Sequence, residues 1–177
     1  MIVLDYFPPV YFEQTAAIVE EGKKFHLSEL PSQLQPLKPL LDDLCALAKK
    51  HHNNPHQKIP VAAIGGCPGI GKTHLSKLLL EELQRQNISC AIVHFDDWTR
   101  PPETRKVGKA NDYFNLEGVH QFFQALSSGS RFIAKPVIDE TTDQHGVEYL
   151  NLNDVDLILF EGLICLSSEV DTNYISY

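Results

Sequence analysis

The stretch GGCPGIGKTH, residues 65–74, decides the fold, because it sets four glycines and one lysine between two apolar segments. The run before it, IPVAAI (59–64), is short and continuously apolar, as in a strand buried on both faces of a parallel sheet. The run after it, THLSKLLLEELQRQN (73–87), repeats leucine at helical spacing and ends at an asparagine that can stop a helix. The stretch therefore predicts a turn from a strand into a helix.

Residues 66–73 match the pattern G-x-x-x-x-G-K-[ST] in full. Glycines let the backbone turn tightly with its N–H groups facing inward, and the start of the following helix adds a positive field for phosphate. Lys72 can reach the outer phosphates, and the hydroxyl of Thr73 can ligate Mg²⁺. The pattern predicts a nucleotide-binding loop, with a glycine-rich turn that binds no ligand as the alternative. The residues expected at the nucleotide are Gly66, Cys67, Pro68, Gly69, Ile70, Gly71, Lys72, Thr73 and His74.

Two further apolar runs, AIVHFDDW (91–98) and LILFEG (157–162), finish in acids. Ligands of open α/β sheets bind beyond the carboxyl ends of the strands, so these acids are expected at the nucleotide. Asp96 can act as a base toward an acceptor hydroxyl or hold the metal, and Glu161 can support the metal. Strand-end acids can instead cap helices or lie on the surface. For Asp97 the two interpretations are balanced, because adjacent residues on a strand point oppositely.

Strand, helix, strand and a later parallel strand predict an α/β sandwich in residues 58–177. Residues 1–57 read as an N-terminal helical extension with two helices, over 9–25 and 36–52. Three histidines near the end of this extension could suggest a metal site, but a solvated helix end fits better because no carboxylate or cysteine lies at ligand spacing.

The composition indicates an ordinary globular protein, with 43% hydrophobic and 21% charged residues in a chain of 177. The net charge of −8 argues against general nucleic-acid binding, which needs a basic surface. No apolar run approaches the roughly 18 residues of a membrane span, and Asp5 stands where a signal peptide would be basic. A cytoplasmic protein without membrane contact is expected. The four cysteines form no C-x-x-C pair and are expected to be free, mostly buried thiols, with zinc or disulfides as the alternative.

The segments GGCPGIGKTHLSKLL, VHFDDW, NDYFNLEGVHQFFQALSSG, KPVIDETTD and LILFEGL, in this order, resemble the uridine kinase and phosphoribulokinase-like P-loop kinases. That group also includes pantothenate kinase and nicotinamide riboside kinase. The resemblance covers about residues 58–166 and implies a three-layer P-loop sandwich. It implies ATP-dependent transfer of the γ-phosphoryl group to a hydroxyl of a small molecule, favouring a nucleoside or nucleoside-like acceptor.

The resemblance also implies residue roles. Lys72 and Asp96 would be catalytic, and the metal ligands for Mg²⁺ would be Thr73, Asp96 and Glu161. The residues expected on the acceptor side are Asp97, Trp98, Arg105, Tyr113 and Asp139. Arg105 belongs to the loop TRPPETRKVGK (99–109), which could hold an anion or could be merely solvated. The phenylalanines at 122 and 123 are expected in the core rather than stacked on a substrate.

The sequence departs from the family pattern in three respects. Ile138 replaces the tyrosine of a P-x-Y-D segment, and ETTDQHG (140–146) lacks the arginine that commonly follows it. Such folds usually continue into an arginine-rich lid and two more core strands, whereas this sequence ends at Tyr177. A lid supplies positive charge during transfer. The chain is therefore expected to be a fragment, or to lack a lid of its own and be weakly active or inactive. A nucleotide-binding regulatory protein and a P-loop NTPase are the alternatives, and the oligomeric state is left open.

Overall fold

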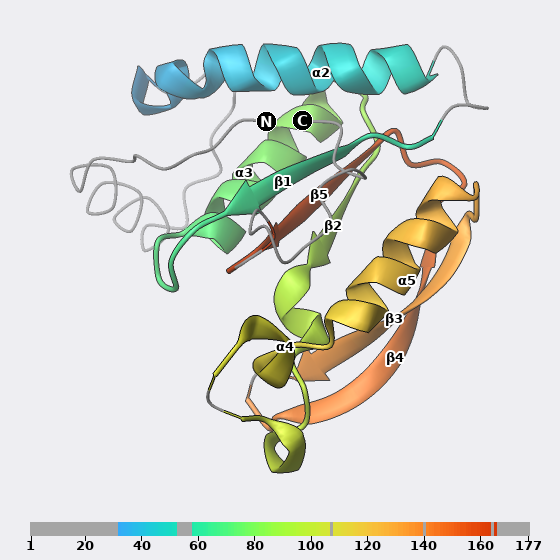
Figure 1. The fold of residues 1–177 in the computed structure, drawn as a ribbon. Coiled ribbons are helices and arrows are strands. Elements are labelled where there is room, and N and C mark those ends of the chain that lie inside the picture. Colours follow the sequence, from blue (N-terminus) through green and yellow to red (C-terminus); the bar gives the residue numbers. More distant parts are fainter. Residues whose placement is uncertain (1–31, 53–57, 107, 140, 164, 166–177) are drawn as a thin grey trace.

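The computed structural model describes residues 32–52, 58–106, 108–139, 141–163 and 165. Three strands form a parallel sheet in the order β1–β5–β2 (Figure 1). Their bounds are Val61–Gly65 for β1, Cys90–His94 for β2 and Leu157–Gly162 for β5. The central strand, β5, pairs with both neighbours, so that Glu161 lies in register with Ile64 on one side and His94 on the other. The expected parallel sheet is confirmed.

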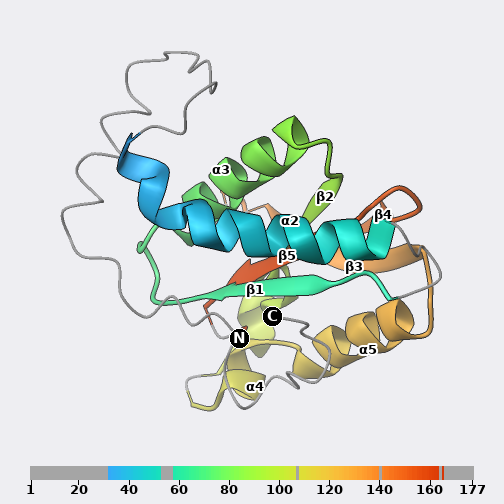
Figure 2. The same cartoon turned by 90° about the horizontal axis from the view of Figure 1, so that it is seen from above.

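Helices cover both faces of this sheet (Figures 1 and 2). One face carries α2 (Lys38–His52), which follows the 3₁₀ helix η1 (Ser32–Leu37), and α3 (Lys72–Arg85). The other face carries α5 (Leu116–Ser127). Because successive strand residues point to opposite faces, Leu157 and Leu159 of β5 pack toward α2 and α3, while Ile158 and Phe160 pack toward α5. The result is the predicted three-layer arrangement.

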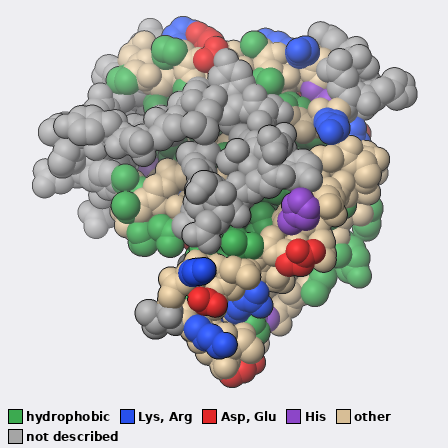
Figure 3. Space-filling view, in the orientation of Figure 1, with side chains coloured by type: hydrophobic (Ala, Val, Ile, Leu, Met, Phe, Trp, Pro, Cys, Tyr) green, Lys and Arg blue, Asp and Glu red, His purple; other side chains and the backbone are tan. Residues whose placement is uncertain are grey.

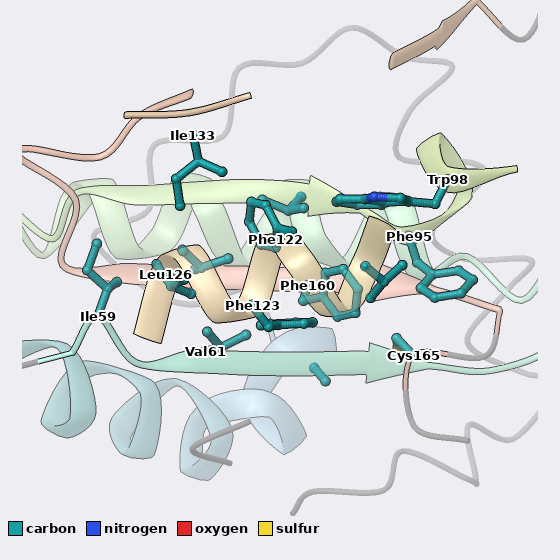
Figure 4. Packing of buried hydrophobic residues seen from close by; sticks show 14 of the residues in the cluster. Ile59, Val61, Phe95, Trp98, Phe122, Phe123, Leu126, Ile133, Phe160 and Cys165 are labelled. Carbon is teal, nitrogen blue, oxygen red and sulfur yellow. The ribbon is translucent and has the colours of Figure 1, made fainter. Parts of the chain in front are cut away.

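Aromatic rings dominate the core on the α5 side of the sheet (Figure 4). Phe160 of β5 lies 5.0 Å from Phe123 of α5 between ring centroids, in an edge-to-face geometry. Trp98 lies 5.4 Å from Phe122 in a similar geometry. Edge-to-face pairs of this kind stabilise a core beyond the effect of area burial alone. The expectation that Phe122 and Phe123 pack in the core is confirmed, since they are 3% and 1% exposed.

A two-stranded antiparallel hairpin lies beside α5 and was not predicted from the sequence. It consists of β3 (Phe132–Asp139) and β4 (Gln144–Asn151). Three short helices connect β2 to α5, and they are η2 (Phe95–Trp98), η3 (Pro102–Thr104) and α4 (Ala110–Tyr113). The strand expected to run to residue 98 therefore ends at His94, and its acids lie on η2.

The helix expected over residues 36–52 is confirmed as α2, whose leucines pack into the same cluster as α3 and the sheet. The helix expected over 9–25 lies outside the described residues, and the domain division after residue 57 stays a prediction. In the described part of the chain no helix has the length and apolarity to cross a membrane. The four cysteines are free as expected, but only Cys165 is buried and Cys67 is exposed.

Candidate functional site

The glycine-rich loop joins the end of β1 at Gly65 to the start of α3 at Lys72. Gly69 and Gly71 adopt φ of 73° and 88°, in the left-handed region where a side chain is strained. Gly71 is the N-cap of α3, and its carbonyl accepts the first helical hydrogen bond from the N–H of Leu75 at 2.9 Å. The first-turn N–H groups of an α-helix have no partner within the helix and attract anions. This backbone geometry is suited to an anion such as phosphate.

Lys72 folds back over this loop. Its Nζ donates a hydrogen bond to the carbonyl of Cys67 at 3.0 Å, so the ammonium is held against the loop. At the same turn the hydroxyl of Ser76 donates to the carbonyl of Lys72 at 2.9 Å. A cation at the positive end of a helix is unfavourable for the helix alone, so its position here is suited to an anionic ligand.

A buried carboxylate lies beside the loop. Glu161, at the end of β5, is 3% exposed, and its Oε1 accepts hydrogen bonds from Thr73 Oγ1 at 2.9 Å and from His94 Nδ1 at 2.6 Å. Burial acts to raise the pKa of Glu161, but these two hydrogen bonds and the charges of His94 and Lys72 together outweigh it, and the pKa is lowered. The bond to Glu161 in turn raises the pKa of His94 above 6.5, against the effect of burial. Glu161 is therefore an anion held by polar donors.

The two aspartates of η2 have different surroundings. Asp96 is exposed, whereas Asp97 is 8% exposed and faces the hairpin. Asp97 Oδ2 lies 2.5 Å from Nζ of Lys135, and Asp97 Oδ1 accepts a hydrogen bond from the N–H of Ile138 at 3.3 Å. Lys135 also pairs with Glu148 at 2.7 Å, across the strands of the hairpin. Asp97 thus fastens η2 to β3 through a buried ion pair.

The loop that follows η2 is tied to the tip of the hairpin. Arg105 Nη2 lies 2.5 Å from Asp143 Oδ1, and the guanidinium lies 5.5 Å from the centre of the Tyr113 ring. Charged side chains of both signs gather at this end of the molecule, where Figure 1 has η3 and α4 (Figure 3). Asp139 accepts hydrogen bonds from the backbone N–H groups of Thr141 and Thr142, at 2.9 and 3.1 Å, which lower the pKa of its carboxyl. The contacts of this region close the hairpin turn onto the loop.

No protein-family model matches the sequence, and no curated protein matches it. Among solved structures, one described as a possible uridine kinase from Bacillus stearothermophilus is 26% identical, with a TM-score of 0.62 over 81% of this chain and 79% of the other. The chain has the fold of a P-loop kinase of the uridine kinase and phosphoribulokinase type.

Two further kinases share this P-loop fold. A fructose transport system kinase from Silicibacter sp. TM1040 is 23% identical, with a TM-score of 0.55 over 69% of this chain and 64% of its own. A D-glycerate 3-kinase from Cryptococcus neoformans is 16% identical, with a TM-score of 0.55 over 73% of this chain and 53% of its own. The chain therefore spans less than two thirds of these two proteins.

The donor set of the P-loop site fits Mg²⁺. This ion prefers carboxylate and hydroxyl oxygens, keeps several waters and takes only one or two ligands from the protein. Thr73 and Glu161 bring such oxygens within 2.9 Å of each other at the mouth of the loop. The described residues include no group of three or more His, Cys, Asp or Glu side chains that could hold a metal ion. The pair of Thr73 and Glu161 oxygens and the lack of a larger cluster among the described residues both agree with a site in which the protein supplies few ligands and the nucleotide supplies the others.

Of the predicted site residues, the structure brings together the loop, Lys72, Thr73 and Glu161. Asp96 lies on η2, directly after the strand end that carries His94. The acceptor-side residues are more scattered: Asp97 is engaged by Lys135, and Trp98 is 2% exposed within the core. The substrate roles expected for these residues stay predictions.

Sequence reasoning missed His94 and Lys135, two partners of the acids. His94 had an available signal, because it occupies the last position of an apolar run that ends at the ligand edge. Lys135 had none, since a lysine next to a proline in KPVID gives no sign of being 3% exposed.

Proposed function

We propose that this chain is an ATP-dependent kinase that transfers the γ-phosphoryl group to a hydroxyl of a small molecule. The favoured acceptor is a nucleoside or a nucleoside-like metabolite, in line with the 26% identity to a protein described as a possible uridine kinase. The observation that carries the proposal is the contact between Thr73 of the phosphate loop and the buried Glu161, at 2.9 Å. It combines a phosphate-binding backbone with oxygen ligands suited to a divalent cation.

In this proposal the residues have separate tasks. The loop N–H groups and Lys72 bind the phosphates, and Thr73 and Glu161 hold Mg²⁺, with Asp96 as a further acid on its acceptor side. The bound ion would neutralise charge on the β- and γ-phosphates. Asp96 would orient the acceptor hydroxyl and accept its proton, since it is the exposed acid of η2. Little covalent chemistry is required of the protein, so positioning and charge stabilisation would supply the rate.

The test is turnover of radiolabelled ATP with Mg²⁺ against a panel of nucleosides, vitamins, sugars and glycerate. Transfer of label to one acceptor, abolished in Lys72→Ala, is the expected result. Nucleotide binding without transfer to any acceptor would favour a regulatory nucleotide-binding protein. Release of phosphate without an acceptor would instead indicate an NTPase.

A further inference from the structure

His94 is the last residue of β2 and lies in register with Glu161 of β5. The two side chains therefore leave adjacent parallel strands at the same edge of the sheet. Nδ1 of His94 is 2.6 Å from Oε1 of Glu161, a short distance typical of a hydrogen bond to an ionised group. Since both residues are fixed in the sheet, this contact does not depend on the conformation of the phosphate loop.

Two donors meet at one oxygen of the carboxylate. His94 Nδ1 and Thr73 Oγ1 both bond to Oε1 of Glu161, at 2.6 and 2.9 Å. A carboxylate offers two oxygens with about four acceptor positions, so Oε2 lies outside these two bonds. The terminal torsion of a glutamate is broad when nothing restrains it. Two donors to Oε1, one from the end of β2 and one from the first turn of α3, restrict that rotation.

We propose that His94 is a positioning residue that fixes the orientation of the Glu161 carboxylate toward the Mg²⁺ of the nucleotide. The inference rests on the proposed function, because it assigns Glu161 to the cation. Partners behind the residues that hold a metal orient them and are worth about 10- to 100-fold in metal affinity. Without His94, Thr73 would be the one remaining donor to Oε1 among the described residues, and Thr73 lies in the first turn of α3, next to the phosphate loop.

Three substitutions of His94 separate this role from a merely structural one. Asparagine places an amide N–H close to the position of Nδ1, glutamine places it close to Nε2, and leucine provides no donor. The side chain of His94 is 41% exposed, so each replacement disturbs little of the core. Binding of ATP is measured by calorimetry over a range of Mg²⁺ concentrations and also in excess chelator.

We expect His94→Leu and His94→Gln to weaken the apparent affinity for Mg²⁺ in the presence of ATP by about 10- to 100-fold. The affinity for ATP without metal stays at the wild-type value, and His94→Asn recovers most of the Mg²⁺ affinity. Unchanged or tighter Mg²⁺ affinity in His94→Leu overturns the inference. An equal loss of metal-free ATP binding in His94→Leu also overturns it, because such a loss indicates a structural role. Failure of His94→Asn to restore the Mg²⁺ affinity overturns it as well. If the wild-type chain binds no ATP with Mg²⁺, the proposed function itself fails.

A second measurement needs no variant to fold. In the wild-type protein, the Nδ1 proton of His94 in a short bond to a carboxylate should give a far-downfield proton NMR signal. We expect that signal to shift when Mg²⁺ and ATP are added together, and to stay in place with ATP in chelator. A signal that is absent, or that responds equally to both additions, overturns the inference.

Discussion

Replacing Lys135 by methionine should destabilise the fold severely. The lysine side chain is 2% exposed, and its Nζ lies 2.5 Å from Asp97, whose side chain is 11% exposed. Its second partner, Glu148, is 45% exposed and can return to solvent when the lysine is removed. Asp97 cannot, so Lys135→Met leaves a buried anion without its cation. Breaking a buried pair in this way costs about 3–5 kcal/mol.

A second mutation, expected to restore part of the lost stability, makes this prediction specific. Asp97→Asn keeps a carbonyl oxygen for the N–H of Ile138, 3.3 Å away, and carries no charge. We therefore expect Lys135→Met/Asp97→Asn to be more stable than Lys135→Met alone, by about 1–3 kcal/mol, as coupled neighbours behave in double-mutant cycles. Lys77→Met, at an exposed position of α3, is the matched control and should change stability by less than about 0.5 kcal/mol.

Urea unfolding followed by tryptophan fluorescence is the assay, because Trp98 is the single tryptophan, is 2% exposed and adjoins Asp97. With a slope of about 2 kcal/mol per molar urea, the midpoint of Lys135→Met should fall by roughly 2 M. A loss of unfolding free energy below about 1 kcal/mol would mean that the pair is well solvated, contrary to the burial of Lys135 and Asp97. A double variant less stable than Lys135→Met would refute the reasoning outright.

Three further predictions concern the site and the core. Asp96→Asn should leave ATP binding unchanged and lower phosphoryl transfer by about a thousandfold, as measured by radiolabel transfer, and normal turnover would exclude Asp96 as the base. Burial lowers the pKa of His51 below its ordinary 6.5, so the folded state binds fewer protons and stability should fall as the pH drops below 6.5. In His51→Leu the urea midpoint should depend less on pH below 6.5 than it does in the wild-type protein. An unchanged pH dependence would contradict the assignment to His51. Cys67 is exposed, whereas burial raises the pKa of Cys90 and of Cys165 to about 12, so iodoacetamide should label Cys67 first. Mg²⁺-ATP should slow that labelling, and equal rates with and without nucleotide would count against the site.

The sheet and the phosphate loop could be predicted because their signals are local. The apolar run of β5 is buried at all six positions, and such a run has few uses other than the centre of a parallel sheet. The glycines of the loop have a conformational reason to be there, seen in the left-handed φ of Gly69 and Gly71. The leucines of α3 lie on one face. In each case the residue types and their spacing are enough to predict the local structure.

The hairpin could not be predicted because its stability comes from distant contacts. The residues of β4, QHGVEYLN, do not alternate regularly between apolar and polar, and seven of the eight are exposed. In β3, Lys135 and Pro136 interrupt any apolar pattern. The ion pair that fixes β3 to η2 joins Lys135 to Asp97, 38 positions earlier in the chain. A pattern of neighbouring residues cannot predict a pair that is this far apart in the sequence.

The surroundings of the three acids at this edge separate their roles more clearly than their positions in the sequence do. Asp97 has a buried ammonium for a partner, so its charge is already neutralised and a further cation would gain little from it. Glu161 is buried too, but its partners are a hydroxyl and an imidazole, which orient the carboxylate through Oε1. Asp96 is exposed and can meet an incoming hydroxyl. These three surroundings suit three different tasks. A buried acid paired with a lysine joins the hairpin to η2, a buried acid held by polar donors supports a cation, and an exposed acid receives a proton.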